Sequence, residues 1–344
     1  MMNLLITGGA GFIGSSLIRH VIDRSEITKL VNLDCLTYAG HLENLDGIHG
    51  IHPRYLFEQV DLRDKVEVLR VIRQHDITHV MHLAAESHVD RSITGPGDFI
   101  TTNINGTFHL LEACRAHWFD QASGIQNGAS KFLHVSTDEV FGSLGPHDPA
   151  FTETSACTPN SPYSASKAAS DMLVRSYHHT YDLPAVTTRC SNNYGPYQFP
   201  EKLIPVVIQS VLAREPVPIY GDGMNVRDWL YVGDHCEALW SVLTSGKVGE
   251  TYNIGGRSEL ANVHLVQMIC DLIDELKPEL GGHSRSLLGF VPDRPGHDRR
   301  YAMDATKISV ELGWNPAHTL ETGLRETVVW YLQHQGWVES IARG

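Results

Sequence analysis

The sequence predicts an α/β fold built on a doubly wound parallel sheet, and three observations support this prediction. Short apolar segments alternate with segments of helical spacing through the first half of the chain, which is the pattern of successive β-α-β units. A glycine-rich turn follows the first apolar segment directly. Residues 80–85 are nearly all apolar, as strands are when helices cover both faces of a parallel sheet.

Six strands are expected in this half, with a helix at 12–22 after the first of them. The expected strands are 4–7, 29–34, 55–61, 78–85, 132–137 and 185–191.

The character of the sequence changes after about residue 192, where proline and glycine become frequent. Helical spacing returns at 263–276 and 320–335. We expect residues 1–191 to form mainly a cofactor-binding domain. Residues 192–344 are expected to form mainly a smaller α/β region that binds substrate, interleaved with returns to the main sheet.

Composition argues against several classes of protein. Hydrophobic residues make up 42% and charged residues 19% of the chain, which is a globular composition. No apolar run approaches the roughly 18–20 residues of a membrane helix, and no basic segment precedes the first apolar one, as it would in a signal peptide. The formal charge of −13 disfavours nucleic acid as a partner, because binding phosphates needs clustered Lys and Arg. We therefore expect neither membrane nor nucleic acid as a partner.

The cysteines and histidines indicate no disulfide framework and no metal site. Six cysteines are scattered without a C-x-x-C pair, which fits a reduced, cytoplasmic environment. The 20 histidines include no H-E-x-x-H and no paired Cys/His spacing.

The glycine-rich turn carries a dinucleotide-binding pattern. Gly9, Gly11 and Gly14 satisfy G-x-G-x-x-G between a strand and a helix. Glycine lets the backbone approach a pyrophosphate, and the helix amino terminus offers it free N–H groups. Asp34 follows 20 residues after Gly14, where its carboxylate can bind an adenosine ribose and would repel a 2′-phosphate. The pattern predicts a Rossmann-type site for NAD; a turn without a ligand is the alternative.

A second group of residues has the chemistry of proton transfer. Tyr163 and Lys167 are four residues apart, hence on one helix face, and a nearby ammonium favours the phenolate of a tyrosine. Thr137, Asp138 and Glu139 follow the expected strand 132–137. Two carboxyls in one cleft can hold different protonation states, which is what elimination of water requires. The alternatives are an exposed helix pair and a solvated acidic loop.

Together these motifs resemble the dTDP-glucose 4,6-dehydratases of the extended short-chain dehydrogenase family, over nearly the whole chain. The adjacent acids distinguish that family from sugar epimerases of the same fold. The matching segments are TGGAGFIG (7–14), LTYAGHLENL (36–45), MHLAAESHVDRSI (81–93), HVSTDEVFG (134–142), SPYSASKAASD (161–171), CSNNYGPYQFPEKLIP (190–205), PIYGDGMNVRDWLYVGDH (218–235), ETYNIGG (250–256) and DRPGHDRRYAMD (293–304).

The resemblance implies a reaction in three stages: oxidation at C4 of the sugar, elimination of water across C5 and C6, and reduction at C6, with NAD regenerated. Tyr163, Lys167 and Thr137 would serve the oxidation, and Glu139 and Asp138 the elimination. The expected NAD-binding residues are Gly8, Gly11, Phe12, Ile13, Gly14, Asp34, Leu36, Thr37, Asp61, Leu62, Leu83, Ala84, Ala85, Ser87, Thr102, Tyr163 and Lys167. The expected nucleotide-sugar-binding residues are Ser87, Thr137, Asn192, Lys202, Leu203, Pro218, Tyr220, Arg227, Asn262, Arg294 and His297.

The resemblance also implies a homodimer formed through helices near 98–117 and 163–181. Phe141 stands where the family pattern has a tyrosine, and the segment between Phe141 and Phe151 is shorter than in many members.

Three alternatives remain open from the sequence. They are a dehydratase for a UDP- or CDP-linked sugar, a nucleotide-sugar epimerase, and a silent cofactor-binding scaffold. Loss of water in the product separates the epimerase from the dehydratases, and any turnover excludes the scaffold.

Overall fold

The computed structural model describes residues 1–119 and 129–343. Within these residues, seven strands form one sheet in the order β10-β6-β5-β4-β1-β2-β3, and every neighbouring pair is parallel. The strands are β1 (Met2–Thr7), β2 (Ile27–Asp34), β3 (Tyr55–Gln59), β4 (His79–His82), β5 (Lys131–Thr137), β6 (Ala185–Cys190) and β10 (Thr251–Ile254). The strand order reverses between β1 and β4, which is where open parallel sheets bind ligands.

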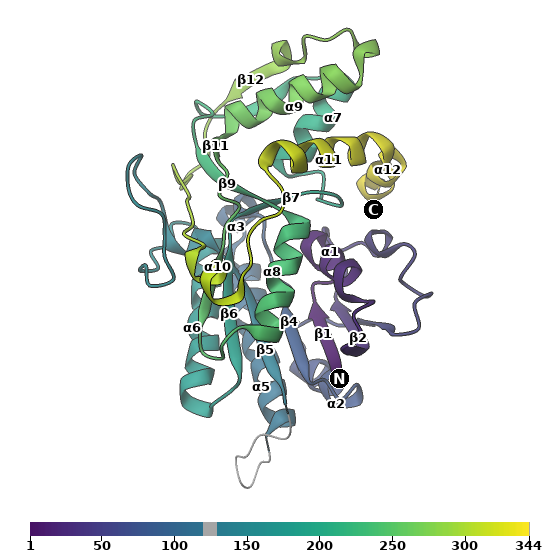
Figure 1. The fold of residues 1–344 in the computed structure, drawn as a ribbon, viewed down its shortest axis with the longest axis vertical. Coiled ribbons are helices and arrows are strands. Elements are labelled where there is room, and N and C mark those ends of the chain that lie inside the picture. Colours follow the sequence, from purple (N-terminus) through teal and green to yellow (C-terminus); the bar gives the residue numbers. More distant parts are fainter. Residues whose placement is uncertain (120–128, 344) are drawn as a thin grey trace.

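Helices cover both faces of this sheet, as the apolar strands predicted (Figure 1). Leu4 and Ile6 of β1 belong to one buried cluster and Leu5 to another, because successive side chains of a strand point to opposite faces. The first cluster is covered by α1 (Phe12–Val21), α8 (Val232–Ser245) and α10 (Thr306–Leu312). The second is covered by α2 (Lys65–Gln74), α5 (Thr107–Trp118) and α6 (Pro162–Tyr181).

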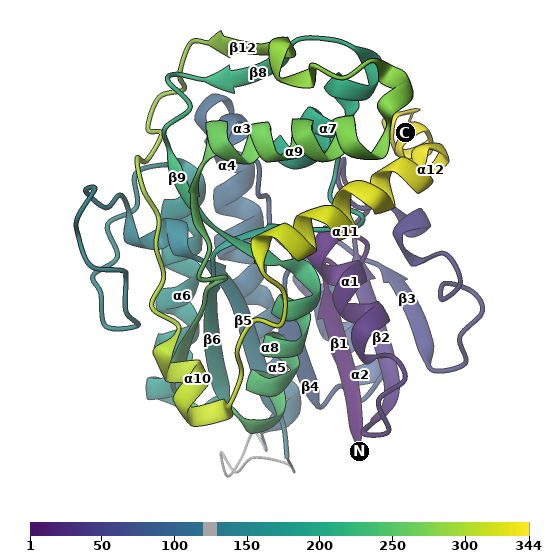
Figure 2. The ribbon, with the colours of Figure 1, turned by 45° about the horizontal axis from the view of Figure 1, so that its top comes forward.

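A smaller group of elements lies over the carboxyl ends of the main strands (Figure 2). It has its own core, which includes Val207, Ile269 and Leu324. Its strands are β7 (Asn192–Tyr194), β8 (Val217–Tyr220), β9 (Val226–Tyr231), β11 (Glu259–Ala261) and β12 (Leu288–Val291). Its helices are α7 (Leu203–Ala213), α9 (Asn262–Leu276), α11 (Leu320–Gln333) and α12 (Gln335–Arg343). We refer to these elements as the cap.

The connection from β4 to α5 is mostly helical and borders the space beneath the cap. It contains α3 (Val89–Thr94), α4 (Pro96–Phe99) and a π-helical turn at Ile100–Gly106. Asn103 in that turn donates to the carbonyl of Glu86 and accepts from its amide. The chain after β4 is therefore tied to the helix beside it.

The α/β fold class is confirmed, and the six expected strands are all present with different ends. The expected strand 78–85 stops at His82, because the amides of Leu83 and Ala84 turn to the Thr7 hydroxyl and the Glu86 amide bonds to the Asn103 side chain. The expected helix at 320–335 is interrupted at His334 and continues as α12. In the described part of the chain, no helix is both long and apolar enough to span a membrane.

Candidate active site

A cleft of about 370 Å³ lies where the carboxyl ends of the main strands face the cap. It joins the glycine-rich turn to the Tyr163–Lys167 pair in one space. The expected cofactor residues that line it are Gly8, Gly11, Phe12, Ile13, Gly14, Asp34, Thr37, Asp61, Leu62, Leu83, Ala84, Ala85, Ser87, Thr102, Tyr163 and Lys167. Leu36 is not among the lining residues; its amide donates to the Asp34 carboxylate from a backbone with φ of 55°.

The glycine-rich turn is too tightly packed for side chains. Gly8 has a φ of +71°, and a Cβ there would lie 2.8 Å from the Cα of Ala84. A Cβ at Gly14 would lie 2.1 Å from the Gly8 carbonyl oxygen. Gly11 begins α1 without any side-chain cap, so the first amides of the helix are free for an anion.

Asp34 at the end of β2 holds the turn in shape. Its carboxylate accepts hydrogen bonds from the Ala10 and Leu36 amides, each at 2.9 Å. Burial raises the pKa of Asp34, although these amides favour its charged form. Each carboxylate oxygen can accept a further hydrogen bond, so the side chain is still able to bind a ribose.

The end of β3 carries a paired carboxylate. Asp61 accepts from the Arg63 side chain through both of its oxygens, at 2.6–3.0 Å. This pairing holds the pKa of Asp61 below its usual value. The Asp61 side chain is therefore fixed at the rim of the cleft together with Arg63, which the sequence analysis did not include.

Neighbouring strand ends are locked by a chain of hydroxyl and imidazole groups. The Thr7 hydroxyl accepts from the amides at 83–84 and lies 2.7 Å from Nδ1 of His82. Its proton is thus directed to Nδ1, and Nε2 of His82 donates to Thr107 at 2.9 Å. Burial lowers the pKa of His82 well below its usual value, which agrees with a neutral ring. Thr107 in turn donates to the Asn103 carbonyl.

Tyr163 and Lys167 lie on α6 facing the cleft, as their spacing predicted. Ser161 caps this helix by accepting from the Ser164 amide, and Pro162 begins it. The Lys167 ammonium donates to the Val135 carbonyl at 2.8 Å. Burial raises the pKa of Tyr163 well above its usual value, and a hydrogen bond from Thr137 opposes that shift.

Asp138 and Glu139 follow β5 in a short 3-10 turn that Thr137 caps. Asp138 is 2% exposed, and its Oδ2 has no hydrogen-bond partner in the described structure. Burial, and then the charge of Glu139, raise the pKa of Asp138 well above its usual value. Burial also raises the pKa of Glu139, but Arg294, Arg227 and Lys202 oppose the shift. The two neighbouring acids are thus placed for different protonation states.

The expected sugar-nucleotide residues fall into two groups. Ser87, Thr137, Asn192 and Lys202 line the cleft. The others lie outside its lining: Leu203, Pro218, Tyr220, Arg227 and Asn262 in elements of the cap, and Arg294 and His297 in the segment that follows β12. Two of the residues outside the lining, Arg227 and Arg294, still affect the cleft electrostatically, because their charges lower the pKa of Glu139.

The two arginines are held in different ways. Arg227 is 5% exposed, donates to the Asp298 carbonyl at 2.9 Å and packs over the ring of Tyr301. Arg294, in the segment after β12, pairs with Asp90 at 3.0 Å, and its Nε is buried with no hydrogen-bond partner among the described residues. Arg294 therefore retains an unused donor.

The structure also places in the cleft residues that the sequence analysis did not single out. Glu201 lies between Lys202, 3.7 Å from its Oε1, and His88, 3.5 Å from its Oε2. Gln198 lines the cleft with its Oε1 buried and without a hydrogen bond in the described structure. The adjacent acidic and basic residues in FPEKLIP could have indicated Glu201 as a candidate. No pattern in the sequence indicates Gln198.

Comparison with known proteins places these features in a family. A family model described as GDP-mannose 4,6 dehydratase matches residues 5–327. A dTDP-glucose 4,6-dehydratase from Neisseria meningitidis is 56% identical over all of this chain and 97% of its own length.

Solved structures give the same picture. A dTDP-glucose 4,6-dehydratase from Streptomyces venezuelae, crystallised with NAD bound, is 43% identical with a TM-score of 0.90, over 99% of this chain and 100% of that one. A UDP-glucose 4-epimerase from Thermus thermophilus, in complex with NAD, is 32% identical with a TM-score of 0.83, over 97% and 100% of the two chains.

Proposed function

This chain belongs to the dTDP-glucose 4,6-dehydratases of the GDP-mannose 4,6-dehydratase family, and on that premise we propose how its cleft performs the reaction. Its substrate is dTDP-glucose, its products are dTDP-4-keto-6-deoxyglucose and water, and its cofactor is NAD. The observation that carries the proposal is the pair Asp138 and Glu139, two acids in unequal environments beside Tyr163.

The turn between β1 and α1 fits NAD. Side chains at Gly8 and Gly14 would clash with neighbouring backbone, so glycine allows the tight turn that leads into α1. The start of α1 has no side-chain cap, which leaves its first amides free for a pyrophosphate. Asp34 would hold the adenosine ribose. Bound NAD would supply the acceptor for the hydride of C4 and its donor to C6, and its positive charge would favour the phenolate of Tyr163.

The first proton transfer falls to Tyr163. The phenolate of Tyr163 removes the proton of the sugar 4-hydroxyl, and Lys167 stabilises that phenolate by its charge. Thr137 hydrogen-bonds the oxygen that becomes the 4-ketone. A positioned acid or base of this kind contributes about 10²–10⁴-fold in rate.

Elimination of water falls to the two acids. The 4-ketone acidifies C5, and Glu139 removes the C5 proton. Asp138, which burial keeps protonated, donates its proton to the departing 6-hydroxyl, and water leaves. When hydride has returned to C6, Glu139 gives its proton back to C5, which completes the 4-keto-6-deoxy sugar. The electrostatic difference between the two carboxyls supports these roles, because the cations around Glu139 favour its charged form.

Substrate binding falls to the cap and the nearby cleft wall. Lys202, Arg227 and Arg294 are cations near the acids, and the buried Nε of Arg294 has no partner in the part of the chain that the structure describes. Guanidinium groups recognise phosphate oxygens by charge-assisted hydrogen bonds. In this division residues 1–191 bind mainly NAD, and residues 192–344 bind mainly the nucleotide sugar.

The epimerase is the second candidate, because such an enzyme shares the fold. It is disfavoured by the higher identity and TM-score of the dehydratase. The acid pair also argues against it, because an epimerase eliminates no water and needs no acid and base for that step.

We further propose a homodimer and a cytoplasmic location. Helices α5 and α6 expose Phe108, Met172 and Tyr181, at 41–50%, and a second copy would cover them. All six cysteines are free thiols, as in a reducing compartment.

The direct test is conversion of dTDP-glucose, without added reductant, into a product lighter by one water. Turnover of UDP-glucose at the same rate would remove the nucleotide preference from the proposal.

A further inference from the structure

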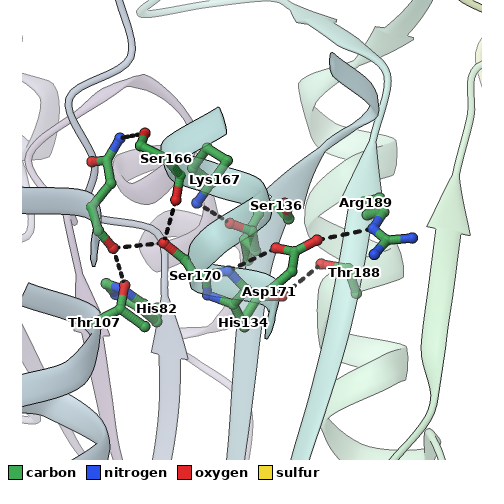
Figure 3. A network of polar contacts seen from close by, with 12 residues as sticks. His82, Thr107, His134, Ser136, Ser166, Lys167, Ser170, Asp171, Thr188 and Arg189 are labelled. Carbon is green, nitrogen blue, oxygen red and sulfur yellow. Dashed lines mark hydrogen bonds and ion pairs between the residues drawn. The ribbon is translucent and has the colours of Figure 1, made fainter. Parts of the chain in front are cut away.

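Figure 3 shows a network of polar contacts around Lys167 and Asp171, of which the reaction scheme above uses only Lys167. Lys167 and Asp171 are four residues apart on α6 and are 4% and 3% exposed. At this spacing their side chains are neighbours on one helix face. Asp171 therefore lies on the side of the Lys167 stem that points away from the cleft and into the sheet.

Asp171 bridges the helix to two strands. Its Oδ1 lies 3.2 Å from Nε2 of His134 on β5, and its Oδ2 accepts from Nε of Arg189 on β6 at 3.0 Å. Arg189 also packs over the ring of Phe141, in the turn that carries Asp138 and Glu139. One carboxylate thus connects α6, β5, β6 and the acidic turn.

The Lys167 ammonium hydrogen-bonds the Val135 carbonyl rather than Asp171, so Asp171 acts on it through space, as the carboxylate of this buried cluster. On β5 the neighbour is His134, and on β6 they are Arg189 and the neutral thiol of Cys190; His82 on β4 is neutral. Asp138 and Glu139 bear instead on the Tyr163 hydroxyl. Among the described residues, Asp171 is the carboxylate that acts on the Lys167 ammonium.

We propose that Asp171 is a positioning residue of the reaction. Its buried carboxylate keeps the Lys167 ammonium charged beside Tyr163, and His134 and Arg189 hold that carboxylate in place. The inference rests on the proposed function, since Lys167 acts through Tyr163.

The protonation states agree with this role. Burial lowers the pKa of Lys167, and Asp171 is the largest opposing influence. Burial alone would raise the pKa of Asp171, but His134 and Arg189 outweigh it and hold that pKa below its usual value. Burial, and then Lys167, lower the pKa of His134, so its neutral ring donates through Nε2.

A structural role also uses the charge of Asp171, because Arg189, which is 6% exposed, pairs with it. Burying an ion pair costs desolvation, and replacing it by apolar residues is often neutral or stabilising. The proposed role differs from a structural one in that the carboxylate also maintains the charge of Lys167. Without Asp171, the pKa of Lys167 falls, and Lys167 loses its proton at a lower pH.

The test is the pH dependence of the oxidation step alone. The rate of NADH formation is measured in a single turnover with dTDP-glucose between pH 6 and 10, so that Asp138 and the elimination do not enter. Asp171→Asn is expected to move the pH at which the rate falls on the basic side down by about one unit, because an opposite charge nearby shifts a pKa by 1–3 units. A rate lowered by the same factor at every pH would overturn the proposal.

His134→Gln is the matched control, because the Gln amide can still donate to Asp171 and no charge changes. This variant is expected to leave unchanged the pH at which the rate falls on the basic side. A shift equal to that of Asp171→Asn would also overturn the proposal. Should Asp171→Asn fail to fold, because Arg189 is left unpaired, Asp171→Asn with Arg189→Gln removes both charges. In the double variant the rate is again expected to fall at a lower pH than in the parent enzyme. An unchanged pH would contradict the proposal.

The two levels of inference fail separately. If the parent enzyme forms no NADH with dTDP-glucose at any pH, the proposed function is wrong. If the parent forms NADH and the pH at which the rate falls does not move in the variants, only the role of Asp171 is wrong.

Discussion

Asp138 and Glu139 are consecutive in the chain, yet their carboxyl groups meet different surroundings. Asp138 is buried, with Oδ2 unpartnered in the described structure, and burial followed by the charge of Glu139 raises its pKa. Burial acts on Glu139 too, but Arg294, Arg227 and Lys202 favour its charged form. The two acids are adjacent in the sequence, and the cations near Glu139 make their electrostatic surroundings different.

Replacing the base is expected to stop the reaction after oxidation. Glu139→Gln keeps the shape of the side chain but cannot take the C5 proton, so turnover should fall by about 10²–10⁴-fold. NADH should then accumulate on mixing with dTDP-glucose, as followed by its absorbance. Turnover at the parent rate would show that another group removes the proton.

Replacing the buried acid is expected to change stability in a pH-dependent way. The folded-state pKa of Asp138 is raised, so its contribution to stability is fully present below the unfolded pKa. It is lost as pH rises through the folded pKa. Asp138→Asn lacks this loss and should be more stable than the parent at pH 7–8, by about 1.4 kcal/mol for each unit of pKa shift.

The advantage of Asp138→Asn should shrink toward pH 4. Thermal unfolding of both proteins across this pH range measures it. An advantage that grew on acidification would mean that Asp138 is ionised in the folded protein.

Removing the phenol is expected to block the first step. Tyr163→Phe keeps the ring, including its edge contact with Phe99, but has no group to take the 4-hydroxyl proton. Neither NADH nor product should form above about 10⁻² of the parent rate, while the NAD content of the purified protein should stay the same. NADH formation at the parent rate would assign the proton to another residue.

Replacing Asp34 is expected to weaken NAD binding. Asp34→Ala removes the acceptor of the Ala10 and Leu36 amides as well as the expected ribose contact, so affinity should fall about tenfold or more, the equivalent of roughly one charged hydrogen bond. Asp64→Ala is the control, because Asp64 likewise accepts from two amides but lies at the start of α2, outside the cleft lining. Equal NAD affinity in both variants would remove Asp34 from the cofactor site.

Local patterns in the sequence were enough to predict much of the main sheet and the cofactor turn. The glycine spacing around Gly11 follows from close backbone approach, and Tyr163 with Lys167 follows from helical period. Both signals lie within a few residues of chain, where physical constraints act directly on the sequence.

The remaining parts depend on contacts between distant segments. Strands β7 and β11 have three residues each, too few for a period of two to be recognised, and pairing with β9 defines them. Arg294 meets Asp90 across 204 positions of the chain. The counter-ion role of Asp171 likewise depends on β5 and β6 being neighbours, which no local pattern states.

The measurement that tests the central claim most directly is the mass of the product formed from dTDP-glucose by the purified protein without added reductant. We expect a product that has lost one water, with no net NADH after completion, because the hydride taken from C4 returns to C6. A product of unchanged mass with an inverted sugar carbon would identify an epimerase, and would contradict the assignment of Asp138 and Glu139 as the acid and base of elimination.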